Sequence, residues 1–145
     1  MIKTLLLPGG LGYIGSHTIV ELLAVHKIKL VIIDNYSNCQ GDIVDRLFQI
    51  LSPEDRELVH VRKGDILNEE FLTEVFREQV ENGTPIEGII HFAALKNATE
   101  SVSEPARYFE VNIQGSLNIL RTMKKFKECK YFLFSSTAAV YGDQD

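Results

Sequence analysis

Glycines at positions 10, 12 and 15 separate an apolar stretch from an amphipathic helical pattern, and Gly9 precedes them. Backbone amides without a neighbouring Cβ can approach a phosphate closely, and the positive end of the following helix dipole attracts an anion. The same glycines could serve only a tightly packed turn between a strand and a helix. A strand before them, a helix after them and an acid further along favour a dinucleotide site.

The acid is Asp34, which lies nineteen residues beyond Gly15 and ends the apolar run at 30–33. A carboxylate at that place accepts hydrogen bonds from ribose hydroxyls and repels a 2′-phosphate. The first arginine downstream, Arg46, lies twelve residues further on. We therefore expect NAD rather than NADP as the ligand.

Polar residues also end three further predicted strands. Asp65 is either an acceptor for an adenine amino group or a surface acid. Lys96 follows the fourth predicted strand, at the edge where α/β sheets bind ligands, although surface lysines are common. Hydroxyls of Ser135 and Thr137 follow the fifth, where they position a substrate hydroxyl or cap a turn. The residues alone leave these alternatives open.

The remaining histidines and cysteines predict neither a metal site nor a nucleophile. His91 lies in an apolar stretch, which favours a hydrogen-bonded core histidine, and His17 is expected to be structural. Cys39 and Cys129 are not in CxxC spacing, so we expect no zinc site and no disulfide framework. A reducing, cytoplasmic compartment follows as an expectation.

Apolar stretches alternate with amphipathic patterns along the chain. The predicted strands are 2–7, 29–33, 58–62, 88–92 and 131–135, and the predicted helices are 13–26, 42–51, 68–82 and 104–126. Strict alternation predicts a parallel sheet with right-handed crossovers, which is a doubly wound, Rossmann-type α/β fold. Residues 53–56 are expected to form a surface turn.

For two of the predicted helices, the spacing of apolar residues predicts which face is buried. For the first helix the expected buried face is Ile14, Thr18, Leu22 and Val25. For the last helix the expected buried face is Val111, Leu117, Leu120 and Met123.

Length and composition limit the classes of protein to which the chain can belong. At 145 residues we expect a single domain spanning 1–145, without a separate substrate domain. A net charge of −5 argues against a nucleic-acid partner, which calls for a basic surface. We expect neither a signal peptide nor a membrane-spanning segment, because no apolar run reaches the necessary length.

Five stretches resemble the UDP-glucose 4-epimerase family, within the extended short-chain dehydrogenases/reductases. They are GGLGYIGSHT at 9–18, DNYSN at 34–38, HFAALK at 91–96, ESV at 100–102 and FSSTAAVYG at 134–142. The glycine pattern specifies only the fold, and the last stretch is shared by many nucleotide-sugar enzymes. The combination of GYIGSHT, HFAALK and ESV is what points to the epimerases.

The resemblance implies a set of NAD contacts and a reaction. The implied contacts are Gly9, Gly12, Tyr13, Ile14, Gly15, Asp34, Asn35, Asn38, Asp65, Ile66, Phe92, Ala93, Ala94, Lys96, Asn112 and Ser135. Thr137 is implied as the catalytic hydroxyl that bonds the sugar 4-OH. The implied reaction interconverts UDP-glucose and UDP-galactose through a 4-keto sugar, as in galactose metabolism, with NAD supplying the hydride chemistry.

The chain departs from the family pattern at several positions. Pro8 replaces the usual threonine, the segment 97–99 differs from the usual AVG, and Thr137 replaces a common serine. Family members place a YxxxK pair soon after the stretch that ends at Gly142, and none of the five tyrosines here has a lysine four positions later. The nucleotide-sugar-binding region of the family is also missing. We expect these 145 residues alone not to epimerise at a useful rate.

Two rival interpretations remain from the sequence. A nucleotide-sugar 4,6-dehydratase calls for an acidic pair after Thr137, where this chain has Ala138 and Ala139. A non-catalytic NAD-binding module fits the missing YxxxK pair. An exposed sheet edge should favour association, with a homodimer as the candidate assembly.

Overall fold

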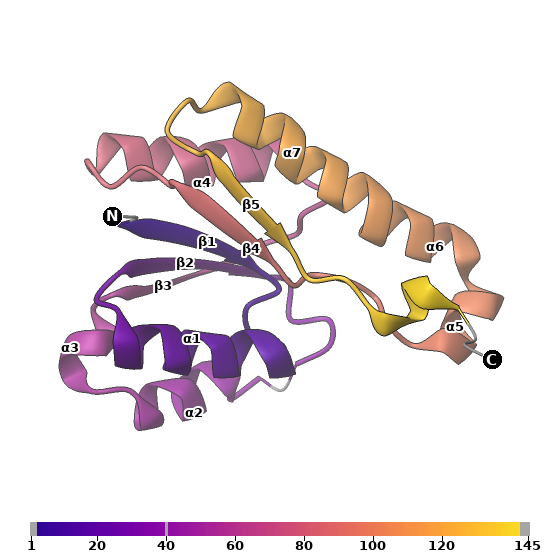
Figure 1. The fold of residues 1–145 in the computed structure, drawn as a ribbon, viewed down its shortest axis with the longest axis horizontal. Coiled ribbons are helices and arrows are strands. Elements are labelled where there is room, and N and C mark those ends of the chain that lie inside the picture. The colour runs from indigo at the N-terminus through magenta and orange to yellow at the C-terminus, as the bar shows by residue number, and fades with distance from the viewer. Residues whose placement is uncertain (1–2, 40, 143–145) are drawn as a thin grey trace.

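Five parallel strands form one sheet across residues 3–39 and 41–142, which are the residues that the computed structural model describes (Figure 1). The strand order is β3-β2-β1-β4-β5. The strands are β1 (Thr4–Pro8), β2 (Lys29–Asp34), β3 (Val59–Lys63), β4 (Gly88–His91) and β5 (Tyr131–Phe134). Each neighbouring pair is parallel, so the predicted doubly wound sheet is confirmed.

Helices cover both faces of this sheet, as short crossovers between parallel strands require. The helices are α1 (Tyr13–Val25), α2 (Ile43–Ile50), α3 (Pro53–Arg56), α4 (Glu69–Glu81), α5 (Ala98–Ser103), α6 (Pro105–Phe109) and α7 (Gly115–Lys125). In Figure 1, α1, α2 and α3 lie on one face, and α4 and α7 lie on the other. No helix in the described ranges is long and apolar enough to cross a membrane.

Alternating side chains of the central strands divide the core into two clusters. Leu5 and Leu7 point to the layer of α1 and α2, whereas Leu6 between them points to the layer of α4 and α7. Successive residues of a strand face opposite sides, so β1 and β2 bury almost every side chain. Burial on both faces explains the continuous apolar runs by which the sequence predicted these strands.

The predicted buried face of α1 is largely wrong, although Leu22 is half-buried against the core. Gly15, Ile19 and Leu23 are buried, whereas Ile14 is 60% exposed and Val25 is 72% exposed. The reason lies at the start of the helix, where Gly15 packs directly on the backbone of the glycine turn. That contact fixes the rotation of the helix, so the residues four and eight positions later face the sheet.

The predicted buried face of the last helix is wrong in part: Met123 packs against the core as predicted, but Ile119 and several small or polar residues also face inward. Gly115 packs against Ile66, and the Asn118 side-chain amide donates to the backbone oxygens of Ile66 (3.2 Å) and Leu67 (3.0 Å). Leu117 and Leu120, predicted to be buried, are 40% and 42% exposed. Satisfied polar groups can be buried at little cost, and a search for apolar spacing does not detect them.

Local polar signals give further helices that the hydrophobic pattern did not predict. Residues 53–56, predicted as a surface turn, form α3, in which the Ser52 hydroxyl accepts a hydrogen bond from the Asp55 amide. Asp55 is buried and pairs with Lys27. The predicted helix 104–126 is divided into α6, a π-helical turn at Glu110–Gln114 and α7. The predicted strand residue Ile2 lies outside the described residues.

His91 is the core histidine that the sequence predicted. Its side chain is 1% exposed, and its Nε2 lies 2.9 Å from the hydroxyl oxygen of Ser116. The rings of Phe132 and Phe134 lie beside it, and its Nδ1 has no partner among the described residues. Burial lowers the pKa of His91 to about 4, so the imidazole is neutral in the folded protein near neutral pH.

Acidification should destabilise the protein through His91. Below a pKa of 6.5 the unfolded histidine binds a proton that the folded one does not bind until about pH 4. Stability is therefore complete above pH 6.5 and falls as the pH falls towards 4. Between about pH 7.5 and pH 5 we expect a loss of about 2 kcal/mol in the free energy of unfolding, measured by urea denaturation.

Two variants separate His91 from other titrating groups. His91→Gln keeps a polar group near Ser116 and should remove most of this pH dependence, whereas His26→Gln, at an exposed position, should leave it unchanged. An equal loss on acidification in His91→Gln and in the parent chain would contradict the assignment.

Candidate functional site

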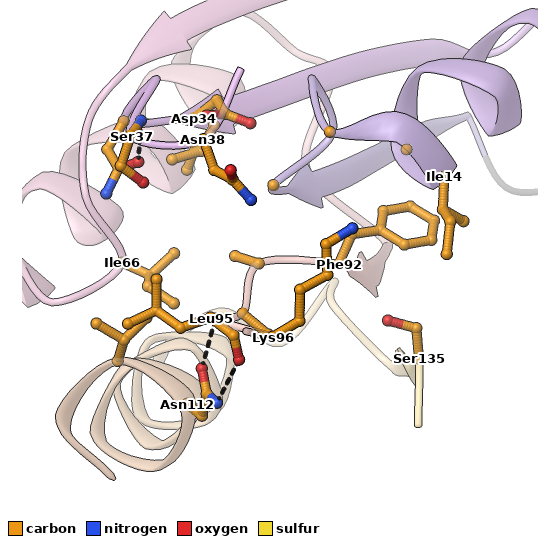
Figure 2. A pocket seen from close by; sticks show the side chains of 18 of the residues that line it. Ile14, Asp34, Ser37, Asn38, Ile66, Phe92, Leu95, Lys96, Asn112 and Ser135 are labelled. Carbon is orange, nitrogen blue, oxygen red and sulfur yellow. Dashed lines mark hydrogen bonds between the residues drawn. The ribbon is translucent and has the colours of Figure 1, made fainter. Parts of the chain in front are cut away.

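A cleft of about 1060 Å³ runs along the carboxyl edge of the sheet (Figure 2). The cleft lies between β1 and β4, whose following connections cross opposite faces of the sheet. Open α/β sheets bind ligands at such a switch point. Every residue predicted from the sequence as a site residue lines this cleft: Gly9, Gly12, Tyr13, Ile14, Gly15, Asp34, Asn35, Asn38, Asp65, Ile66, Phe92, Ala93, Ala94, Lys96, Asn112, Ser135 and Thr137. The structure thus brings together residues from all five strand ends, and the role of each stays a prediction.

Close backbone contacts explain two of the glycines. Gly9 has φ +73°, and a Cβ there would lie 2.5 Å from the Ala93 Cα. A Cβ on Gly15 would lie 2.6 Å from the carbonyl oxygen of Gly10. Side chains at these positions would push the turn away from the strand ends, so both glycines are needed for the shape of the turn itself.

Gly12 is less closely packed than these two glycines. The nearest atom to a Cβ on Gly12 is the carbonyl oxygen of Gly9, at 3.3 Å. This contact is tight but needs only a small shift of that oxygen, so packing within the chain constrains Gly12 less than Gly9 and Gly15. A ligand that approaches the backbone closely would account for glycine at this position.

The first turn of α1 offers unpaired amides to the cleft. Gly12 is the N-cap residue and has no side chain with which to cap the helix, and the first turn contains no acidic residue. The first N–H groups of any helix lack partners within it, and the helix dipole makes this end positive. Tyr13, Ile14 and Gly15 line the cleft at this place, so an anion can be bound there.

The Asp34 carboxylate joins the end of β2 to the glycine turn. Its Oδ2 accepts the Leu11 amide at 3.1 Å, and its Oδ1 accepts the Tyr36 amide at 2.9 Å. Tyr36 has φ +62°, a left-handed conformation that is unusual for a residue with a side chain. A carboxylate has about four acceptor positions, so Asp34 keeps capacity for ribose hydroxyls.

Asp65 is bonded on both oxygens at the same end of the cleft. It accepts the side-chain amide of Asn35 at 2.8 Å and the backbone amide of Leu67 at 2.9 Å. The buried side chain of Ile66 lies beside it on the cleft wall. Asp65 is half-buried, and its two hydrogen bonds fix Asn35 and its own loop.

Asn112 holds the loop that follows β4. Its Oδ1 accepts the Leu95 amide at 2.8 Å, and its Nδ2 donates to the Leu95 carbonyl at 2.9 Å, as Figure 2 shows. Asn112 lies in the π-helical turn at Glu110–Gln114, and such turns are frequent at functional sites. The observed contacts of this predicted cofactor residue are thus with the loop that carries Lys96.

Ser135 and Thr137 line the cleft beyond the end of β5. The Ser135 hydroxyl donates to the backbone oxygen of His91 at 2.7 Å, which ties β5 to β4. Its oxygen can still accept a hydrogen bond.

Several lining residues were missed by the sequence analysis: Ile33, Ser37, Cys39, Gly64, Leu67, Leu95, Arg107, Glu110, Val111, Phe134, Ser136 and Val140. Most of them adjoin predicted residues, so adjacency was the available signal. Arg107, Glu110 and Val140 adjoin no predicted residue. The first two lie in a segment that was predicted as one regular helix, and the sequence gives no signal of its π-helical turn.

Comparison with known proteins places this geometry among nucleotide-sugar enzymes. A family model described as GDP-mannose 4,6 dehydratase matches residues 6–145. The chain is 44% identical over 138 residues to the bifunctional protein GAL10 of Candida maltosa, across 95% of this chain and 84% of that protein. It is 42% identical over 141 residues to the UDP-glucose 4-epimerase of Pasteurella multocida, across 97% of this chain and 38% of that protein.

Solved structures of epimerases have the same fold. The UDP-glucose 4-epimerase from Bifidobacterium longum, in complex with NAD⁺ and UDP, gives a TM-score of 0.83 at 37% identity, over 97% of this chain and 38% of that chain. The enzyme from Stenotrophomonas maltophila, with bound NAD and formylated UDP-arabinopyranose, gives 0.85 at 34% identity, over 99% of this chain and 39% of that chain. The chain thus spans about two fifths of these epimerases.

Replacing Gly9 by alanine should cost much more stability than replacing Gly83. Both residues have positive φ, but a Cβ on Gly83 meets no atom within 4 Å, whereas one on Gly9 clashes with the backbone at Ala93. We expect Gly83→Ala to lower the free energy of unfolding by about 1 kcal/mol and Gly9→Ala by about 3 kcal/mol or more, measured by urea denaturation. Equal losses would show that the contact with Ala93 is not a constraint.

Proposed function

This chain belongs to the GDP-mannose 4,6 dehydratase family, and from that premise we propose that its cleft binds NAD as the cofactor site of a UDP-glucose 4-epimerase. Residues 1–145 are proposed to form the NAD-binding domain of such an enzyme. The observation that carries the proposal is the uncapped start of α1 at Gly12, which lies on the same cleft as the Asp34 carboxylate. A positive helix end and a ribose acceptor are the two groups that a dinucleotide needs at this edge.

The residues present fit the cofactor on structural grounds. Gly12 has no side chain and lines the cleft at the uncapped N-terminus of α1, so a diphosphate can approach the backbone there. Asp34 would hold the adenosine ribose, and Asp65 would face the adenine end. Lys96 would extend towards the diphosphate, and Phe92 and Ser135 would border the nicotinamide half.

In the proposed reaction the protein contributes binding and orientation. When bound, NAD supplies hydride acceptance and return at the sugar C4 position. Thr137 would hydrogen-bond the sugar 4-OH from the segment that follows β5, and the buried strand ends would keep water from the cleft floor. Holding the reacting hydroxyl in the correct orientation lowers the entropic part of the activation barrier, and this contribution to the rate can be large.

The two rival functions differ at identifiable residues. Positions 138 and 139, where a dehydratase of the expected pattern carries acids, are alanines in this chain. The dehydratase in the family description therefore fits less well than the epimerase named among the relatives. A non-catalytic NAD-binding module keeps the same cleft, and only turnover separates it from an enzyme.

Location and assembly are also proposals. Cys39 and Cys129 are free thiols, which fits a reducing compartment such as the cytoplasm. β5 is an edge strand with Tyr131 and Leu133 exposed, and such an edge favours association of two copies.

The 145 residues alone should show no turnover of UDP-galactose. No tyrosine of this sequence is followed by a lysine four positions later, and loss of a positioned general base typically lowers a rate by roughly 10²–10⁴-fold. A coupled assay that detects UDP-glucose, with NAD present, should stay at background. Turnover above background would show that another group in the chain serves as the base.

NAD should bind more tightly than NADP by about tenfold or more. A 2′-phosphate would lie against the Asp34 carboxylate, which is fixed by the amides of Leu11 and Tyr36 and cannot turn away without losing them. Titration calorimetry of the chain with each nucleotide measures the ratio. Equal affinities would mean that Asp34 does not contact the ribose.

Gly12→Ala tests where the diphosphate binds. A Cβ at this position meets only the Gly9 carbonyl oxygen, at 3.3 Å, so the variant should fold after a small shift and lose far less stability than Gly9→Ala. The added methyl group should nevertheless weaken NAD binding by about tenfold or more, since it stands between the diphosphate and the helix N-terminus. A folded Gly12→Ala that binds NAD as the parent does would place the diphosphate elsewhere.

A further inference from the structure

A tyrosine outside the cleft is bonded to the loop that carries Lys96. The Tyr108 hydroxyl, on α6, accepts a hydrogen bond from the Asn97 amide at 3.1 Å. The same hydroxyl donates to the Glu100 carboxylate at 2.9 Å. Arg107 donates to the other oxygen of Glu100 at 2.8 Å, so the carboxylate is held on both sides.

The backbone on either side of Lys96 is therefore fixed by a different side chain. Asn112 makes two hydrogen bonds to the backbone of Leu95, which precedes the lysine. Tyr108 makes one hydrogen bond to the backbone of Asn97, which follows it. A long, flexible lysine side chain gains a defined position only if the backbone that carries it is held.

Lys96 itself is placed to act on a ligand. Its side chain extends into the cleft in Figure 2, and Lys96 lines the cleft although its own loop is exposed. No carboxylate among the described residues lies within ion-pair distance of its ammonium group. The ammonium is thus a cation available to an anionic ligand.

We propose that Tyr108 is a positioning residue, which through its hydrogen bond to the Asn97 amide holds Lys96 towards the diphosphate-bearing ligand of the cleft. The inference rests on the proposed NAD site and adds a residue that does not line that site. Glu100 belongs to the same arrangement. Its carboxylate accepts the hydrogen bond that the Tyr108 hydroxyl donates, so the phenol oxygen is oriented to accept the hydrogen bond from the Asn97 amide. Burial and the Glu100 carboxylate raise the pKa of Tyr108, which keeps the phenol protonated as this arrangement needs.

Tyr108→Phe tests the proposal by removing one oxygen atom. Calorimetric titration with NAD should show an affinity about threefold to tenfold lower than that of the parent chain, as expected for one lost hydrogen bond. Titration with AMP, which has the adenosine end but no diphosphate bridge, should be unchanged. Tyr131→Phe, at the opposite end of β5 and outside the cleft, is the matched control and should bind both nucleotides as the parent does.

A double-mutant cycle shows whether Tyr108 acts through Lys96. In a Lys96→Met background, Tyr108→Phe should cause no further loss of NAD affinity, because the cation that it positions is gone. Salt provides a second readout: NAD affinity of the parent should fall as ionic strength rises, and Tyr108→Phe should have a smaller salt dependence. A merely structural tyrosine would leave that dependence unchanged.

The possible failures are distinguishable from one another. A folded parent chain that binds neither NAD nor AMP overturns the proposed function, and the positioning role with it. A parent that binds NAD, together with a Tyr108→Phe variant of equal NAD affinity, overturns the positioning role alone. The positioning role is also overturned if Tyr108→Phe lowers the affinities for NAD and AMP equally, or if it still lowers NAD affinity in the Lys96→Met background. Should Tyr108→Phe fail to fold, Glu100→Gln, which weakens the acceptor of the same hydroxyl, replaces it under the same criteria.

Discussion

The contact between the glycine turn after β1 and the backbone after β4 is the constraint on which the rest of the site depends. Gly9 lies so close to Ala93 that no side chain fits between them, and its amide donates to the Ile33 carbonyl of β2 at 2.8 Å. Three strand ends are thereby joined at one place. After this contact, α1 packs on one face of the sheet and α7 packs on the other. The cleft lies between these two segments.

Charged groups and a helix end line different parts of the cleft. In Figure 2, Asp34 lies on one side, Ile14 at the start of α1 lies on the other, and Lys96 extends from the loop after β4. Most of these groups are oriented by backbone hydrogen bonds rather than by one another, as with Asp34 and the amides of Leu11 and Tyr36. Groups held in this way need little reorganisation when a ligand arrives, which favours binding.

The sequence predicted the strands closely because the central ones are buried on both faces, and continuous apolar runs such as 30–33 have no other explanation at that length. It predicted the helix faces poorly, because those faces depend on contacts between distant residues. Gly15 against Gly10 sets the rotation of α1, and Asn118 against Ile66 sets that of α7. Neither contact has an apolar pattern to reveal it.

The sequence predicted residues that line the cleft where a strand end or a family motif indicated them. It did not predict a residue such as Tyr108, which contacts the backbone of a cleft loop and does not line the cleft. Tyr108 shows this limit. In the sequence it stands out only as a tyrosine that lacks the lysine of a YxxxK pair four positions later, whereas in the structure its hydroxyl accepts a hydrogen bond from the loop that carries Lys96. Residues that touch a ligand are constrained by that ligand's chemistry, which motifs record. Residues that hold a loop are constrained only by its conformation, so many side chains could serve and no fixed spacing identifies them. The bonds of Asn112 to Leu95 extend the argument, since a residue predicted as a ligand contact fixes the same loop. In the proposed site, NAD binding would therefore depend on the backbone between β4 and α7 as well as on the glycine turn that first indicates it.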